Sequence, residues 1–263
     1  MEMDLKSIQK VQYRILCETD RICRKHDIPY FLGQGTLLGA VKYKGFIPWD
    51  DDIDVLIPHD ALKRLMKVFP EEADPEYFLT NYRVEKHMPL SWSKIRAVNT
   101  LSRPKRYKDI PINWGICIDL FPVYPICNLS LIRRAEEFLF RSANKIIMAE
   151  FTEYEEEHGR FERFLEKIPL WLRHRILSGV EHLLALHGNK SKYVLLPCKG
   201  IKVIRRSMIF GEPAKLLFED REFPVPSDYD GYLTLNFGDY MAPLPADRQK
   251  GHDFKMGEIE WRL

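Results

Sequence analysis

The chain has 263 residues, of which 45% are hydrophobic and 30% are charged, as is usual for a soluble globular protein with a sizeable core. Its 40 basic and 38 acidic residues leave a net charge of +2, whereas a nucleic-acid partner usually requires a clustered basic face. No apolar run approaches the roughly 18–20 residues of a membrane span, and the charged N-terminus lacks the apolar core of a signal peptide. The 5 widely spaced cysteines favour reduced thiols in the cytosol over disulfides or structural zinc.

The first 125 residues alternate predicted helices with predicted strands. Apolar residues recur near every 3.6 positions from Leu5 to His26, which predicts a helix. The next expected elements are a strand at 30–32, a helix after Gly33, a strand at 52–57, a helix at 59–68, and strands at 77–81, 90–98 and 116–121. This mixture predicts an α+β fold.

The chain changes character after residue 128. Residues 129–187 are rich in Glu, Arg, Leu and Phe, which indicates a helical insertion. Within it, residues 168–177 mix apolar and basic side chains, as in a helix that lies on an anionic membrane surface. A helix packed on a core shows the same pattern, and we favour that interpretation. We therefore divide the chain into a catalytic core (1–128), a helical insertion (129–192) and a C-terminal segment (193–263).

An acidic run, residues 50–54, enters a predicted strand. Because side chains alternate along a strand, Asp50, Asp52 and Asp54 share one face and Asp51 points away. Asp52 and Asp54 then lie roughly 6.6 Å apart along the strand, so their carboxylates can converge on one or two cations. Oxygen ligands favour magnesium or manganese over zinc. A solvated turn is the alternative, but the apolar residues 55–57 that follow directly are typical of a buried strand.

Two glycines, Gly33 and Gly35, follow the apolar strand at 30–32, and Thr36 opens the next predicted helix. Backbone amides at a helix N-terminus and the positive end of the helix dipole suit a phosphate, and glycine lets it approach closely. A Gly-x-Gly turn alone is weak support for such a site. Its position one helix before the acidic strand strengthens the prediction of a phosphate-binding turn.

These motifs resemble a known superfamily and one family within it. Gly33-Gln34-Gly35-Thr36, followed after one helix by Asp52-Ile53-Asp54-Val55, resembles the signature of DNA polymerase beta-like nucleotidyltransferases. The longer string from Gly35 to Val55 resembles the LicD family, whose bacterial members transfer phosphocholine from CDP-choline to cell-surface glycans. Fukutin and fukutin-related protein, which use CDP-ribitol, carry a related segment. Further likenesses lie at residues 94–96, 236–241 and 251–254, so the resemblance spans most of the chain and is weakest across 129–187.

The resemblance implies a nucleotidyltransferase-type mixed sheet flanked by helices, with the C-terminal segment returning to the catalytic core. It also implies a third carboxylate from a neighbouring strand, for which Asp119 is the candidate. An aspartate in an apolar strand is costly to bury unless it is paired or binds metal, although an exposed edge position would explain it as well. We predict Asp52, Asp54 and Asp119 as catalytic residues, and these three with Asp50 as metal ligands.

Basic side chains are the candidates for holding the donor's phosphates. Lys94 and Arg96 lie two apart on a predicted strand, share a face and can neutralise a diphosphate, although a solvated basic face is the alternative. Lys42 is a secondary candidate, and the resemblance adds Gln34 and His252 to the donor-binding set.

Four aromatic residues near these motifs are candidates for a cage around a quaternary ammonium such as choline, through cation–π attraction. They are Trp49, Trp92, Tyr107 and Trp114. Aromatic residues also fill protein cores, and that interpretation is favoured for any one of them.

Together these predictions describe a magnesium- or manganese-dependent enzyme that passes a phospho-alcohol, first of all phosphocholine, from a CDP-alcohol to a hydroxyl of a glycan acceptor and releases CMP. The acceptor would be a lipopolysaccharide or teichoic acid precursor. The alternatives are CDP-ribitol, CDP-glycerol or CDP-ethanolamine as donor, an NTP-using nucleotidyltransferase, and a non-catalytic binding protein. Cytosolic donors predict a cytoplasmic location, with peripheral contact to the inner membrane face where the acceptor is lipid-linked.

Overall fold

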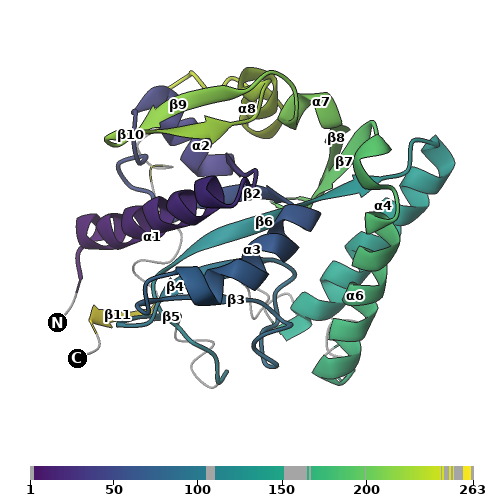
Figure 1. The fold of residues 1–263 in the computed structure, drawn as a ribbon, viewed down its shortest axis with the longest axis horizontal. Helices are drawn as coiled ribbons and strands as arrows, with labels where there is room; N and C mark the ends of the chain where they lie inside the picture. The colour runs from purple at the N-terminus through teal and green to yellow at the C-terminus, as the bar shows by residue number, and fades with distance from the viewer. Residues whose placement is uncertain are drawn as a thin grey trace.

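The structure is a computed structural model that describes residues 3–104, 110–150, 165, 167–198, 200–243, 245, 249, 251 and 257–261. Its centre is a mixed sheet of seven strands with helices packed around it (Figure 1). This architecture confirms the predicted α+β class. Among the helices of the described residues, none combines the length and the apolar character needed to cross a membrane.

The sheet is built around one long strand, β6, which pairs with different partners along its length. The strand order is β1-β2-β6-β4-β3, and β7 and β8 continue from the second half of β6. Among the strands that the structure describes in this sheet, β2 pairs with β6 in parallel and the other pairs are antiparallel. The strands are β1 (Phe31–Leu32), β2 (Asp54–Pro58), β3 (Tyr77–Thr80), β4 (Ser93–Ala97), β6 (Cys117–Ile126), β7 (Tyr193–Leu196) and β8 (Lys202–Arg205).

Two amphipathic helices, α1 (Leu5–Lys25) and α3 (His59–Glu72), contact each other and the strands of the sheet (Figure 1). The N-terminus of α1 is capped by Asp4, whose carboxylate accepts a hydrogen bond of 2.8 Å from the Ser7 amide. Its apolar face is buried, as the 3.6-residue period predicts.

A further group of elements lies at the top of Figure 1. It consists of α2 (Gln34–Lys42), α7 (Arg206–Ile209), α8 (Tyr229–Phe237) and the hairpin of β9 (Ala214–Phe218) and β10 (Arg221–Val225). The strand β11 (Gly257–Trp261) pairs with β5 (Thr100–Pro104), which brings the end of the chain beside the first half. Elements after residue 193 thus contact those before residue 128.

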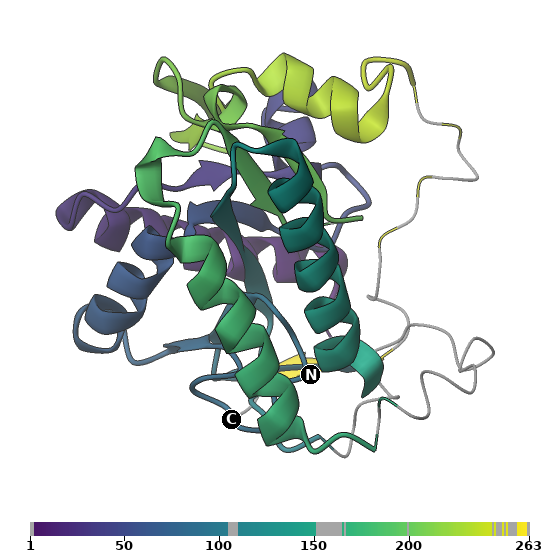
Figure 2. The ribbon, with the colours of Figure 1, turned by 90° about the vertical axis from the view of Figure 1, so that its right-hand side faces the viewer.

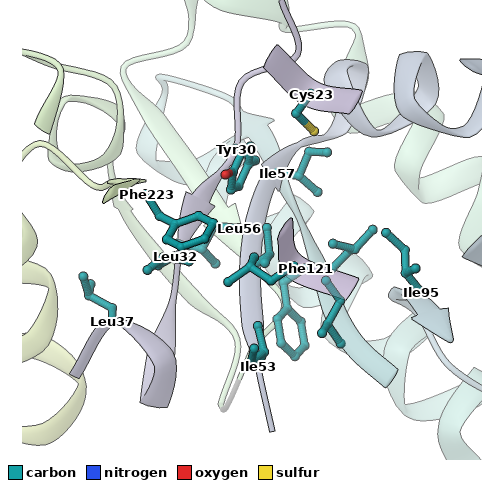
Figure 3. Packing of buried hydrophobic residues seen from close by; sticks show 14 of the residues in the cluster. Cys23, Tyr30, Leu32, Leu37, Ile53, Leu56, Ile57, Ile95, Phe121 and Phe223 are labelled. Carbon is teal, nitrogen blue, oxygen red and sulfur yellow. The ribbon is translucent and has the colours of Figure 1, made fainter. Parts of the chain in front are cut away.

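The main core joins these parts. Leu32, Leu56 and Phe121 come from three strands of the sheet, Leu37 from α2 and Phe223 from the hairpin, and all are buried (Figure 3). Full burial of such a side chain contributes roughly 1.5–3 kcal/mol. The hairpin is therefore held by the same core as the central sheet.

The described residues of the predicted insertion include the helices α4 (Ser130–Ile147) and α6 (Leu170–Ala185), with the 3-10 turns η2 (Met148–Glu150) and η4 (Gly188–Lys190). The two helices pack on each other, and α6 also contacts β6. In the segment for which we weighed core packing against a membrane surface, Arg173 and Leu177 are buried whereas Trp171 is 62% exposed. One face of α6 thus packs inward, as favoured, and the other face remains open.

A buried carboxylate, Glu181, connects α6 to the sheet. It accepts hydrogen bonds from the hydroxyls of Tyr82 (2.5 Å) and Tyr124 (2.6 Å) and from the guanidinium of Arg83 (2.5 Å). These donors satisfy a charge that would otherwise be costly to bury.

Some element ends differ from the sequence predictions. The strand β2 starts at Asp54 rather than at residue 52, and β6 continues to Ile126 rather than ending at 121. The helix α3 runs past the predicted end through Pro70, which lies in its last turn. Proline removes one backbone hydrogen bond there, but the neighbouring Phe69 is buried and holds the turn in place.

His59, at the start of α3, makes the fold sensitive to acid. Burial lowers its pKa to about 4, and its ring lies 4.8 Å from that of Tyr124. The unfolded chain takes up the proton near pH 6.5, so stability due to neutral His59 is present above that pH and is lost as the pH falls towards 4. When the pH is lowered from 7 to 4.5, we expect the unfolding free energy of the wild type to fall by about 2–3 kcal/mol more than that of His59→Phe, as measured by urea denaturation. Equal losses in both proteins would contradict this assignment.

Candidate active site

A row of charged side chains crosses three adjacent strands. Asp54 of β2 is the register partner of Asp119 of β6, and Asp119 is the register partner of Lys94 of β4. Register partners project to the same face of a sheet, so the three side chains lie side by side. The adjacent Val55 and Leu120 project to the opposite face and are buried in the core.

Two further carboxylates, Asp50 and Asp52, lie in the loop that leads into β2. A side-chain carbon built on Gly35 would lie 2.8 Å from Asp50 Oδ2 and 3.9 Å from Asp52 Oδ1, so both carboxylates lie beside the same glycine. Burial raises the pKa of Asp54 well above its ordinary value, and the charges of Asp52, Asp119 and Asp50 raise it further. The structure thus brings together all four carboxylates predicted as metal ligands.

This cluster has the donor chemistry of a site for a hard divalent cation. Carboxylate oxygens are the ligands of magnesium and manganese, and a cation would relieve the repulsion that Asp54 experiences from its neighbours. In the part of the chain that the structure describes, no three His, Cys, Asp or Glu side chains are already arranged around a common point for a metal. Asp119 instead forms an ion pair with Lys94. The donor set therefore fits the cation, and metal binding remains a prediction.

Asp119 is held from two sides. Lys94 Nζ contacts one carboxylate oxygen, and Trp92 Nε1 donates to the other at 3.2 Å. Burial alone would lower the pKa of Lys94, but the charge of Asp119 outweighs this and keeps that pKa above its ordinary value. Lys94 is therefore a charged, half-buried donor next to the carboxylates.

The glycine turn fixes the start of the acidic strand. Gly33 donates its amide to the Asp54 carbonyl at 2.9 Å, and the Thr36 hydroxyl accepts the Asp54 amide at 2.7 Å. Gln34 adopts a φ of 40° and donates through Nε2 to Tyr232 Oη at 2.6 Å and to Cys198 Sγ at 2.8 Å. The described contacts of this turn are thus internal to the protein, and phosphate binding by its amides remains a prediction.

The two other basic candidates have distinct surroundings. Lys42 Nζ donates to the carbonyls of residues 240–242 at 2.9–3.3 Å, which ties α2 to the segment after α8. Arg96 is buried and donates through Nη1 to the Gly115 carbonyl at 3.0 Å, while its Nε has no hydrogen-bond partner among the described residues. The Nε of Arg96 therefore remains available as a donor two residues along the strand from Lys94. The ammonium of Lys42, in contrast, already donates to three backbone carbonyls.

The aromatic candidates do not all lie in one place. Trp92 borders Asp119 and stacks near Phe121, with ring centres 5.4 Å apart. Trp49 precedes the acidic loop and packs edge-on against Tyr43 at 6.1 Å. Trp114 is buried, with the Arg96 guanidinium 5.5 Å from its ring centre. Tyr107 and His252 lie outside the described residues.

Two glutamines of α1 position the acidic loop and were missed from the sequence. Gln9 Nε2 donates to the Asp50 carbonyl at 2.8 Å, and Gln12 Nε2 donates to the Asp51 carbonyl at 2.6 Å and to the Cys117 carbonyl at 3.2 Å. A signal was present for Gln12, which interrupts the apolar face of the helix and is buried there.

Fold and site together define an α+β protein in which four neighbouring carboxylates and a half-buried lysine come from adjacent strands and from the loop before β2. A family model described as LicD/FKTN/FKRP, nucleotidyltransferase domain, matches residues 27–149, which contain all of these side chains. The resemblance to the LicD family that the motifs indicate is thereby confirmed for this part of the chain.

Three relatives extend the comparison. The chain is 28% identical, over 279 aligned positions, to the protein of Haemophilus influenzae named lipopolysaccharide cholinephosphotransferase LicD, and the alignment covers 98% of this chain and 99% of that protein. An uncharacterized protein of Rickettsia prowazekii is 39% identical over 59 residues, which are 22% of each chain. One of Rickettsia typhi is 37% identical over 59 residues, 22% of this chain and 19% of its own.

Proposed function

We propose that this chain is a transferase that moves phosphocholine from CDP-choline to a hydroxyl of a cell-surface glycan, releases CMP and requires magnesium or manganese. The observation that carries the proposal is the row of Asp54, Asp119 and Lys94 across three strands, with Asp50 and Asp52 beside it. The end-to-end likeness to the Haemophilus influenzae protein supports phosphocholine as the transferred group and lipopolysaccharide as the acceptor class.

The roles of the residues follow from their positions. Asp52, Asp54 and Asp119, with Asp50, would hold the divalent cation, which when bound polarises the donor's diphosphate and neutralises developing charge. Lys94 and Arg96 would bind phosphate oxygens from the neighbouring strand. The acceptor oxygen forms a bond to the phosphorus that carries choline, the bond from that phosphorus to CMP breaks, and the hydroxyl proton passes to a carboxylate of the cluster.

The donor and the location are parts of the same proposal. CDP-ribitol, CDP-glycerol and CDP-ethanolamine would present the same diphosphate to the cluster. Trp92 lies beside Asp119 and could bind a quaternary ammonium through cation–π attraction, which favours choline as the transferred alcohol. Because CDP-alcohols are cytosolic, we place the protein in the cytoplasm.

A CMP-release assay tests the proposal. Purified protein is incubated with magnesium, a lipopolysaccharide acceptor and, in separate reactions, each of the four CDP-alcohols or CTP. We expect release of CMP that is fastest with CDP-choline, is abolished by EDTA and is lost in the Asp52→Ala/Asp54→Ala variant. The matched control is Asp27→Asn, at an exposed turn with φ of 49° that asparagine tolerates well. Equal CMP release by the double variant would refute the proposal, and pyrophosphate release from CTP would indicate a nucleotidyltransferase.

A further inference from the structure

The outer face of the helical pair carries apolar side chains that nothing in the described structure covers. The helices α4 and α6 lie side by side at the front of Figure 2. Leu131 is 81% exposed and Leu186 is 69% exposed, at the start of α4 and just after α6. The exposed apolar side chains of this region, which we call the apolar ridge, are Leu129, Leu131, Ile132, Phe138, Leu183 and Leu186.

The apolar ridge is built into the pair by helical periodicity. Glu136 and Phe140 mark the buried face of α4, and Leu131 and Phe138 project from the opposite face. On α6, Leu177 and Leu184 are buried, whereas Leu183 and the residue that caps the helix, Leu186, are exposed. His187 Nε2 lies 2.6 Å from Glu136 Oε1, which places the end of α6 against the start of α4. Both helices therefore contribute to one exposed apolar end.

Basic side chains lie beside this end, and we call them the basic border. They are Arg133, Arg134, Lys190, Lys192, Arg205 and Arg206. The Arg133 guanidinium lies 3.9 Å from the ring centre of Tyr193, and the Lys192 amide donates to Asn128 Oδ1 at 2.7 Å. Tyr193 and Lys192 in turn line a cavity of about 520 Å³ whose other walls include Arg205 and Arg206. Arg134 and Lys190, which are close in sequence to Arg133 and Lys192, are exposed to solvent.

The acidic residues of the same helices do not offset this charge. Glu136 is buried and bonded to His187, and Glu181 is buried in its own hydrogen-bond network. Glu137 is paired with Arg141 at 2.7 Å. The basic border therefore presents positive charge to whatever meets the apolar ridge.

We propose that the apolar ridge and its basic border bind the surface of an anionic lipid bilayer. Apolar side chains enter the boundary between headgroups and acyl chains, and lysine and arginine attract anionic headgroups. A second copy of this chain fits less well, because a two-fold interface would place each basic border close to its symmetry mate. The inference concerns binding alone and does not require the proposed transferase activity.

Vesicle co-sedimentation tests this inference. The full chain is centrifuged with vesicles of phosphatidylethanolamine and phosphatidylglycerol, and separately with vesicles of phosphatidylcholine. We expect binding to the phosphatidylglycerol vesicles that weakens as salt is raised, and little binding to phosphatidylcholine, because the basic border acts through screened electrostatics.

Two double variants separate the contributions. Arg134→Ser/Lys192→Ser should lower partitioning onto phosphatidylglycerol vesicles about 25-fold, from the usual gain per basic residue at an anionic surface. Leu131→Ser/Leu186→Ser should lower it by about tenfold or more. The matched control is Leu217→Ser in the β9–β10 hairpin, which removes an exposed leucine elsewhere and should leave partitioning unchanged.

Circular dichroism confirms that each variant is folded, and light scattering reports the oligomeric state. The inference fails if the wild type does not sediment with phosphatidylglycerol vesicles or binds phosphatidylcholine equally well. It also fails if both double variants partition like the wild type. A wild-type dimer that Leu131→Ser/Leu186→Ser converts to a monomer would assign the ridge to a second copy instead.

Discussion

The Asp54→Asn variant should lose transferase activity and at the same time become more stable than the wild type in the absence of metal. Asp54 is buried beside three other carboxylates, so removing its charge removes repulsion while keeping the shape of the side chain. We expect kcat/KM for CMP release to fall by at least about 10³-fold, since a cation ligand is lost. The unfolding free energy in EDTA should rise by about 1–3 kcal/mol.

Thermal denaturation with and without magnesium completes this test. A ligand that binds only the folded protein stabilises it by about 2.7 kcal/mol at one hundred times its Kd, so magnesium should raise the Tm of the wild type by several degrees. The variant should gain much less. An equal gain in both proteins would show that Asp54 does not bind the cation. A lower Tm of the variant than of the wild type in EDTA would show that the neighbouring carboxylates do not repel Asp54 in the folded protein.

Replacing Glu181 with alanine should destabilise the whole protein strongly. The carboxylate accepts bonds from Tyr82, Tyr124 and Arg83, and its loss leaves the buried hydroxyls of Tyr82 and Tyr124 without their acceptor. We expect the unfolding free energy to fall by about 2–5 kcal/mol in urea denaturation, because each buried hydroxyl left without a partner costs roughly 1–3 kcal/mol. Glu137→Ala, which removes an exposed ion pair with Arg141, serves as the control and should cost less than about 1 kcal/mol. Similar losses in both variants would show that the Glu181 network contributes no more to stability than a surface ion pair does.

Local patterns in the sequence were sufficient for much of the fold. Periodicity predicted α1 almost to its ends, and the apolar run after the acidic residues predicted β2. These predictions needed no knowledge of distant parts of the chain. Alternation along a strand does not explain why Asp50 and Asp52 lie near Asp54, because β2 starts at Asp54 and the other two residues lie in the loop before it.

Contacts between distant residues were not predictable in the same way. The pairing of Lys94 with Asp119 depends on the register of β4 against β6, which no single segment encodes. The carbonyls that surround Lys42 come from residues 240–242, and Gln12 reaches the acidic loop from α1. Such partners are set by how the elements pack, so a sequence motif identifies the residue type without its contacts.

The parallel pairing of β2 with β6 has a consequence for how the protein folds into its active form. It joins Asp54 to Asp119 across a long stretch of chain, and bringing such distant segments together costs loop-closure entropy, which slows folding. A slip of one residue would turn Asp119 to the other side of the sheet while leaving much of the backbone pairing possible. Specific activity is therefore a direct readout of strand register, and a preparation that is compact but incorrectly paired would be recognised by its lack of turnover.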